Sequence, residues 1–178
     1  MPSLNLKDHI RTVPDFPEAG IMYRDITTLL SNPAALKQSV EELAAPFRNS
    51  NIDAIAGIDA RGFIFGTAVA IELGVGFVPV RKKGKLPFKT FEQDYQLEYG
   101  TDTLQIHADA VTKGQRVLVI DDLIATGGTA EAAIKLLQRT ECEVISAAFV
   151  IDLPDLGGAK RIESLGVPVT SLIAFSGH

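Results

Sequence analysis

The sequence predicts an α/β protein in which a central, mostly parallel β-sheet is flanked by helices. Short apolar segments typical of strands alternate with segments of helical periodicity, as in strand–helix–strand units. The segment Arg116–Ile120 is a continuous run of mostly branched residues, which is typical of a strand covered on both faces. The 178 residues, 46% of them hydrophobic and 22% charged, are expected to form one domain over residues 1–178.

The individual elements follow from local signals. Asp53–Ile58 is short and apolar, whereas Gly62–Leu73 is a longer apolar stretch that ends at Gly74, a common helix terminator. Gly128–Arg139 keeps its apolar positions at helical spacing. In chain order, we expect strands at Asp53–Ile58, Gly76–Val80, Arg116–Ile120, Glu143–Ile151 and Val167–Phe175, and helices at Gly62–Leu73, Gly128–Arg139 and Gly158–Gly166.

Two segments depart from this pattern. The opening of the chain, up to about Asp25, is predicted to be rich in loops. Lys82–Val111 is polar and lacks a helical period, although Asp102–Ala108 alternates like an exposed strand. A long connection with little structure of its own inside a compact domain is often functional, so we expect Lys82–Val111 to be a lid.

Composition excludes several classes of protein. The single cysteine, Cys142, forbids a disulfide within the chain and favours a reducing compartment. The opening residues do not have the pattern of a secretory signal, and no apolar run approaches the ~18 residues that a membrane span needs. The net charge of −5 and the pI of about 5.2 argue against a non-specific nucleic-acid binder.

The segment "VLVIDDLIATGGTA", Val117–Ala130, predicts a binding site for a sugar phosphate. Ligands of open α/β sheets sit beyond the carboxyl ends of strands, where Asp121 and Asp122 are expected. The turn that follows, Ala125–Thr129, supplies glycines, hydroxyls and a helix N-terminus, all of which suit a phosphate. Ionised carboxylates accept hydrogen bonds only, so the two aspartates suit neighbouring hydroxyl groups. A phosphate next to vicinal hydroxyls describes a ribose 5-phosphate.

Competing interpretations of this segment fit less well. No glycine is followed by Lys and then Ser or Thr, as a Walker loop requires, and "GVGFVP" breaks the dinucleotide pattern at Pro79. A plain helix cap would need one capping residue, whereas this segment has two adjacent acids followed by Thr-Gly-Gly-Thr.

With these residues in view, Val117–Ala130 resembles the phosphoribosyl pyrophosphate (PRPP) motif of type I phosphoribosyltransferases. Further blocks narrow the resemblance to the adenine phosphoribosyltransferase family and extend it over nearly the whole chain. These blocks are Pro14–Leu30, Ala56–Gly66, Val78–Pro87, Tyr95–Val111 and Phe149–Ile162.

The resemblance implies a type I phosphoribosyltransferase fold with a flexible hood loop over about residues 82–111 and a base-recognition segment over about residues 1–30. It also implies a reaction in which adenine and PRPP give AMP and pyrophosphate, with Mg²⁺ as cofactor. The enzyme would act in purine salvage as a cytoplasmic homodimer, with no nucleic-acid or membrane partner.

By the same resemblance, Asp121 and Asp122 would accept hydrogen bonds from the ribose hydroxyls and stabilise a developing sugar cation. Mg²⁺ would be held mainly by PRPP and water, so no protein ligand is assigned. The 5′-phosphate would be held by Ala125, Thr126, Gly127, Gly128 and Thr129.

Arg61 matches the arginine of the family on the pyrophosphate side, and Asp59 stands where many members have Glu. Arg81, Lys82 and Lys85 would also bind phosphate groups. A solvated basic loop is the alternative for these three, mainly for the two lysines.

The adenine base would be recognised by the N-terminal block. Phe16, Ile21, Met22 and Tyr23 can form apolar walls, and in the family backbone groups near the positions of Met22 and Arg24 read the edge of the base. Alternatively, the apolar side chains of this block only pack a surface loop on the core.

Glu98 and Tyr99 belong to the hood. We expect Glu98 to take part in removing the N9 proton of adenine, and Tyr99 to help exclude water. With Arg61, Asp121 and Asp122, Glu98 completes the set of candidate catalytic residues.

Two other functions remain open at this point. A phosphoribosyltransferase for another base, such as a 6-oxopurine, would commonly carry a lysine late in the chain, and Val167–His178 has none. A non-catalytic PRPP-sensing regulator would usually add a DNA-binding domain or a basic face, whereas this chain is short and acidic.

Overall fold

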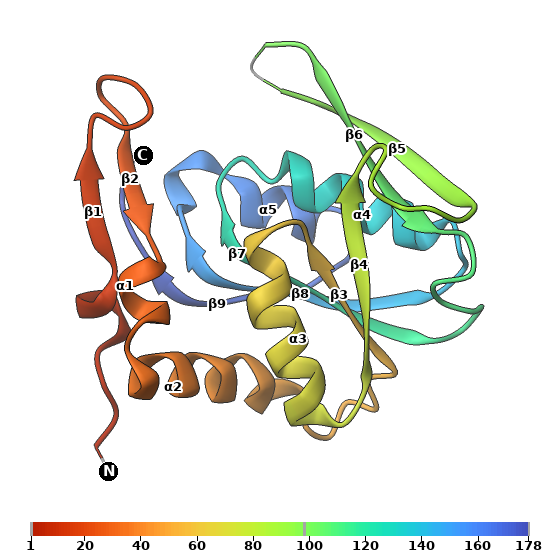
Figure 1. Cartoon of the computed structure of the whole chain (residues 1–178), viewed down its shortest axis with the longest axis horizontal. Helices are drawn as coiled ribbons and strands as arrows, with labels where there is room; N and C mark the ends of the chain where they lie inside the picture. The colour runs from red at the N-terminus through yellow and green to blue at the C-terminus, as the bar shows by residue number, and fades with distance from the viewer. Residues whose placement is uncertain (1, 98, 178) are drawn as a thin grey trace.

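A seven-stranded sheet forms the centre of the molecule, for which the computed structural model describes residues 2–97 and 99–177. In spatial order the strands are β5, β6, β4, β3, β7, β8 and β9 (Figure 1). β4, β3, β7, β8 and β9 run parallel, whereas β6 pairs antiparallel with β4 and β5. The prediction of a mostly parallel central sheet is therefore confirmed. The strands span β3 (Ala54–Ile58), β4 (Gly76–Lys82), β5 (Thr90–Gln96), β6 (Thr101–His107), β7 (Arg116–Ile124), β8 (Glu143–Asp152) and β9 (Val169–Ala174).

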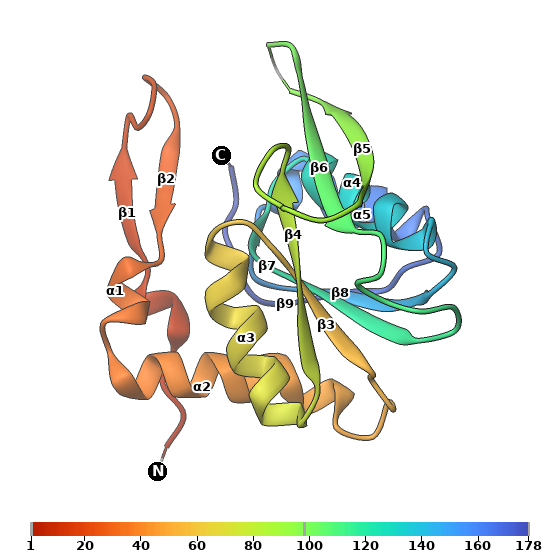
Figure 2. The ribbon, with the colours of Figure 1, turned by 45° about the vertical axis from the view of Figure 1, so that its right-hand side comes forward.

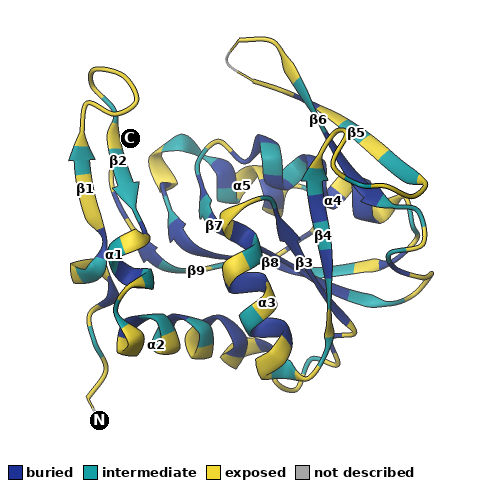
Figure 3. Cartoon of the chain, viewed as in Figure 1, coloured by how far each residue is buried: buried dark blue, intermediate teal, exposed yellow. Residues whose placement is uncertain are grey.

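Helices cover both faces of this sheet. In β7, Leu118 and Ile120 pack into a core with the helices that precede and follow β3, whereas Val117 and Val119 pack into a second core with those that follow β7 and β8. Successive strand residues point to opposite faces, so both faces of β7 are buried, as Figure 3 shows for the centre of the sheet. The α-helices are α1 (Thr27–Leu30), α2 (Pro33–Ala44), α3 (Arg61–Leu73), α4 (Gly128–Gln138) and α5 (Gly158–Glu163), and the 3-10 helices are η1 (Leu6–His9), η2 (Ala45–Phe47) and η3 (Pro154–Leu156). None of the helices in the described part of the chain is long and apolar enough to cross a lipid bilayer.

The opening of the chain is more ordered than the sequence predicted. It contains a separate two-stranded antiparallel sheet of β1 (Arg11–Pro14) and β2 (Met22–Asp25). At the end of β2, hydrogen bonds from the side chain and backbone N–H of Thr27 and from Arg11 lower the pKa of Asp25 to about 2. The strands of this hairpin have four residues each, too few for an alternating pattern to stand out.

Helix α2 was not predicted either, although its start carries two ordinary signals. The side chain of Asn32 accepts a hydrogen bond from the N–H of Ala35 at 3.0 Å, and Pro33 occupies the first helical position.

The segment Lys82–Val111 contains a β-hairpin of β5 and β6, so the prediction of a connection with little structure is wrong. The strand expected at Asp102–Ala108 is present as β6. β5 and β6 pair over seven positions, and the second half, expected to be exposed, buries Leu104 and Ile106. The hairpin rests on α4, and Arg139, directly after this helix, donates a hydrogen bond to the Glu92 carbonyl. The guanidinium of Arg139 also lies over the ring of Phe91, 5.6 Å from its centroid. Figures 1 and 2 show that the two hairpins, β1–β2 and β5–β6, project from the same side of the molecule.

Candidate active site

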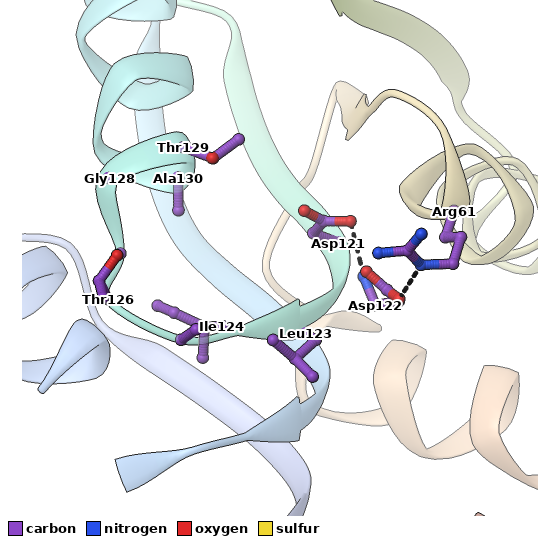
Figure 4. Close-up of a pocket in the computed structure, with 11 residues that line it drawn as sticks. Arg61, Asp121, Asp122, Leu123, Ile124, Thr126, Gly128, Thr129 and Ala130 are labelled. Atoms are coloured by element: carbon purple, nitrogen blue, oxygen red, sulfur yellow. Dashed lines mark hydrogen bonds and ion pairs between the residues drawn. The ribbon is translucent and has the colours of Figure 1, made fainter. Parts of the chain in front are cut away.

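The second half of β7 and the loop after it line a cavity of about 210 Å³. The strand was predicted to end at Ile120, but β7 continues to Ile124 and carries both aspartates within it. The cavity therefore begins at the last part of a strand instead of just beyond it. It is lined by Arg61, Asp121, Asp122, Leu123, Ile124, Ala125, Thr126, Gly127, Gly128, Thr129 and Ala130 (Figure 4).

The loop from Ala125 to Thr129 has the geometry of an anion site. Gly127 has a φ of 87°, a left-handed conformation that glycine adopts without a steric penalty, and α4 begins at the next residue. No side chain of the described residues caps α4 at Gly127. The first N–H groups of the helix are therefore available to a ligand, and the helix dipole favours a negative one.

A second glycine supports this loop from behind. Gly158, the first residue of α5, donates its N–H to the carbonyl of Ala125 at 3.1 Å. A Cβ at Gly158 would lie 2.8 Å from Cγ1 of Ile124 and 3.0 Å from N of Gly127. The first separation is shorter than a carbon atom tolerates and the second is at the lower limit, so the loop conformation depends on the absence of a side chain at Gly158.

The two aspartates have different surroundings. Asp122 is buried, and its Oδ2 accepts a hydrogen bond from Nε of Arg61 at 2.5 Å. Oδ1 of Asp121 accepts the backbone N–H of Asp122 at 2.8 Å. Burial, together with the negative charge of Asp122, raises the pKa of Asp121 well above the usual value of 3.8. A cation or a set of hydroxyl donors next to Asp121 would favour its charged form.

Gly62 allows this arrangement. A Cβ on Gly62 would lie 2.9 Å from both Oδ1 of Asp121 and the carbonyl oxygen of Ile120. The absence of a side chain at Gly62 lets the first turn of α3, and with it Arg61, approach β7 at Ile120 and Asp121.

A second pocket of about 280 Å³ adjoins the first. One wall is β2 with the residue before it, the opposite wall includes η3 with the residue before it, and apolar side chains predominate in the lining. Arg61, Asp122, Leu123 and Ala125 line both pockets. A mostly apolar slot of this size is suited to a flat aromatic ring. Its full lining comprises Ile21, Met22, Tyr23, Arg24, Arg61, Asp122, Leu123, Ala125, Leu153 and Leu156.

Sequence reasoning missed Leu123, Leu153 and Leu156 in this second pocket. Leu153 directly follows β8, the parallel neighbour of β7. The rule that ligands sit beyond the carboxyl ends of parallel strands also indicates this position.

Several predicted residues lie outside both pockets. Phe16 is half-exposed and packs edge-on against Tyr23, with ring centroids 5.1 Å apart. Tyr99 is 85% exposed. Glu98 lies outside the described residues.

The other predicted basic residues, at the end of β4 and in the loop after it, differ from Arg61 in position. Nε of Arg81 donates to Oδ2 of Asp59 at 3.0 Å, directly before α3. Nζ of Lys82 lies 2.7 Å from Oδ2 of Asp102, within the β5–β6 hairpin. Lys85 is exposed in the loop between β4 and β5. Among the described lining residues of the first pocket, Arg61 is the one cation.

A divalent cation fits this site only if it brings other ligands. Over residues 2–97 and 99–177, no three His, Cys, Asp or Glu side chains are grouped to hold a metal ion. Of the two carboxylates in the first pocket, Asp122 is already paired with Arg61. The oxygen donor that remains, Asp121, suits a hard cation such as Mg²⁺ that stays bound to substrate oxygens and water.

The chain is similar to known proteins along almost its entire length. Residues 25–171 match the family model described as "Phosphoribosyl transferase domain". An adenine phosphoribosyltransferase of Maricaulis maris is 58% identical over 174 residues, covering 98% of this chain and 99% of the relative. One from Bradyrhizobium sp. (strain ORS 278) is 58% identical over 175 residues, covering 98% of each chain.

Solved structures give the same similarity. The crystal structure of adenine phosphoribosyltransferase from Rhodothermus marinus superposes with a TM-score of 0.90 at 52% identity and covers 96% of both chains. The Saccharomyces cerevisiae enzyme superposes with a TM-score of 0.88 at 39% identity, covering 94% of this chain and 96% of its own. That enzyme was crystallised in complex with adenine and an imino-altritol bisphosphate.

Proposed function

The chain belongs to the adenine phosphoribosyltransferase family, and on that premise we propose how its two adjoining pockets divide the reaction. The enzyme transfers the 5-phosphoribosyl group of PRPP to N9 of adenine and releases AMP and pyrophosphate, a step of purine salvage. The bond between C1′ and the pyrophosphate oxygen breaks, a bond between C1′ and N9 forms, and N9 loses its proton.

The main support for this division of the reaction is that the two pockets share a wall. The loop of the first pocket is suited to a phosphate, and the slot of the second pocket to a flat base. In AMP, one ribose separates the phosphate from the base. Asp122 and Arg61 lie where the pockets meet, so the ribose and its reacting C1′ would lie next to them.

In the first pocket, the N–H groups and hydroxyls of Thr126 to Thr129 hold the 5′-phosphate. Asp121 and Asp122 accept hydrogen bonds from the 2′- and 3′-hydroxyls. Their negative charge is also in place before C1′ becomes cationic, so it stabilises the transition state without rearrangement.

On the leaving-group side, Arg61 is placed to bind pyrophosphate. Its side chain is about half-exposed despite its bond to Asp122, so its remaining N–H groups can reach a ligand. Arg81, which is paired with Asp59 shortly before α3, would add a second cation. Lys82 and Lys85 would bind only if they turn from their present positions. Mg²⁺, when bound with PRPP, supplies further positive charge to the departing pyrophosphate.

The base is recognised by the open edge of β2. Pro14 stands opposite Met22, and because proline has no N–H this pair is not one of the hydrogen-bonded pairs of the β1–β2 ladder. Hydrogen-bonded pairs alternate, so Arg24, opposite Thr12, is likewise not bonded to its partner. The backbone N–H and C=O groups of Met22 and Arg24 therefore point away from β1, and both residues line the base pocket. They are free to read the edge of adenine.

Glu98 is proposed to accept the N9 proton, directly or through water, and Tyr99 to help close the site. The sequence pattern of the hood supports both roles. In the sequence both residues fall between β5 and β6, and the hairpin of these strands rests on α4, the helix whose N-terminus would hold the phosphate.

We also propose that the enzyme is a cytoplasmic homodimer. Ile64 and Ile71 lie seven residues apart on α3, hence on one helical face, and are 43% and 77% exposed. Such an apolar face is suited to a second copy of the chain. Light scattering after gel filtration should give twice the monomer mass, and Ile71→Lys should halve it.

The activity is tested by offering adenine, hypoxanthine, guanine and orotate separately with PRPP and Mg²⁺. AMP from adenine, with no product from the other bases, is the expected result. Turnover of a 6-oxopurine would overturn the base assignment but keep the ribose-phosphate site. PRPP binding without turnover of any base would favour the sensor function.

A further inference from the structure

We propose that the segment Phe175–Gly177, here called the clasp, sets the width of the base pocket by tying its two walls together. The inference rests on the proposed position of adenine between β2 and η3. The clasp residues do not line the pocket, so they would act as positioning residues. Figures 1 and 2 show the chain end that contains the clasp beside β2, and the contacts on each side define what it joins.

The clasp contacts the β2 wall through Arg24. The guanidinium of Arg24 lies over the ring of Phe175, with Cζ 4.2 Å from the ring centroid. Its Nη2 donates to the carbonyl of Ser176 at 3.5 Å, and its Nη1 donates to Oγ1 of Thr12 at 2.7 Å. Arg24 thus links both strands of the hairpin to the clasp, while its own backbone lines the pocket.

The clasp contacts the opposite wall through the backbone. The N–H of Phe175 donates to the carbonyl of Asp152 at 3.1 Å, directly before Leu153. The N–H of Gly177 donates to Oδ2 of Asp155 in η3 at 2.7 Å. Leu153 and Leu156, which form the apolar wall, are therefore held by residues bonded to the clasp.

A second cation fixes the clasp in place. Nζ of Lys7 lies 4.6 Å from the centroid of the Phe175 ring and donates to the carbonyl of Ala174 at 2.8 Å. Phe175 is only 8% exposed, so its ring is largely shielded from water, whereas Lys7 itself is exposed.

The clasp matters because the main sheet does not fix the position of the hairpin. β1 and β2 form a two-stranded sheet that is not hydrogen-bonded to the main one, and isolated two-stranded sheets are marginally stable. The placement of β2 against η3 therefore depends on side-chain contacts, among which those of Arg24 with the clasp join the two walls directly.

The test is Phe175→Leu, compared with Phe175→Tyr and with the exposed control Phe88→Leu. Phe175→Leu should raise KM for adenine about tenfold and leave KM for PRPP within about twofold, because only ground-state placement of the base is lost. It should also improve 2,6-diaminopurine as a substrate relative to adenine, since a wider pocket admits the extra amino group. Phe175→Tyr, which keeps the aromatic ring, should behave as the parent, as should Phe88→Leu. Equal changes in both KM values, or an unchanged preference between the two bases, would overturn the inference.

If Phe175→Leu fails to fold, a second variant tests whether the clasp sets the width of the base pocket. Asp155→Ala removes the acceptor of the Gly177 N–H from an exposed side chain, and Asp109→Ala, also at an exposed position, is its control. Asp155→Ala should shift the preference between adenine and 2,6-diaminopurine in the same direction, and no shift would contradict the proposal.

Leu156→Phe separates failure of this inference from failure of the proposed base site. If Leu156→Phe leaves KM for adenine unchanged, the base does not bind in this pocket. If Leu156→Phe raises KM for adenine but the clasp variants do not, the base site stands and the clasp inference is wrong.

Discussion

Nε of Arg61 lies 2.5 Å from Oδ2 of Asp122, which joins the first residue of α3 to β7 at the border of the two pockets. The side chain of Asp122 is 7% exposed and that of Arg61 is 54% exposed. The pair therefore gives a buried carboxylate a cationic partner while part of the guanidinium still faces the cavity.

Replacing Arg61 by Met should impair catalysis more than folding. The first pocket would lose the one cation among its described lining residues, so kcat/KM should fall by about 100-fold or more. Asp122 would lose its partner, which should lower the free energy of unfolding by about 1–3 kcal/mol. Steady-state kinetics and urea denaturation measure the two effects. Arg48→Met is the control, because it removes an exposed pair with Glu72 and should change neither quantity by much.

Asp121→Asn should make the protein more stable and less active. The pKa of Asp121 is raised in the folded state, so its ionisation opposes folding. Asp121 therefore leaves the free energy of unfolding of the parent undiminished below the pKa of the unfolded state, about 3.8. That free energy falls as the pH rises through the raised pKa of the folded state. The difference in the free energy of unfolding between Asp121→Asn and the parent, measured by urea denaturation, should therefore be near zero at acidic pH and grow toward neutral pH. A variant that is less stable than the parent at neutral pH would show that Asp121 is a stabilising anion.

Gly158→Ala should weaken PRPP binding from outside the pocket. The added Cβ would collide with Ile124 and with the backbone of the phosphate loop. We expect KM for PRPP to rise at least about tenfold and stability to fall by about 1–3 kcal/mol. Gly76→Ala places its Cβ in open space on β4 and is the matched control. If the kinetics of Gly158→Ala matched those of the parent, the phosphate loop would be able to shift away from the added Cβ without weakening PRPP binding.

Glu98→Gln tests the proton acceptor proposed for N9. The amide keeps the shape of the side chain but cannot accept a proton, so kcat should fall by about 100-fold while KM for PRPP stays near that of the parent. Asp109→Asn, at an exposed position beyond β6, should have no effect. A kcat within a few-fold of the parent would exclude this role for Glu98.

The parallel centre of the fold could be predicted because its strands are covered on both faces. β3 and most of β7 consist of apolar residues in unbroken runs, and such runs are visible without knowledge of their neighbours. The strands β1, β2 and β5 are polar or very short, and they owe their structure to pairing with a partner. Their individual sequences therefore carried no strand signal strong enough to predict them.

The two pockets also differ in how far they could be predicted from the sequence. Apart from Arg61, the phosphate pocket is built from one continuous segment, so its residues could be identified together. The base pocket combines β2 with Leu153 and Leu156, which lie about 130 positions further along the chain. Nothing in the composition of either segment indicates the other, and the contact between them exists only in the folded molecule.

The clasp also bears on the order in which the site is completed during synthesis. Every lining residue of the phosphate pocket lies at or before Ala130, and Gly158, which supports its loop, also precedes the clasp, so that pocket can be complete before residues 175–177 are in place. The hydrogen bond between Arg24 and Ser176 spans 152 positions, and residues 175–177 leave the ribosome after all the residues that line either pocket. A nascent chain would thus be able to hold a sugar phosphate before it can select a base.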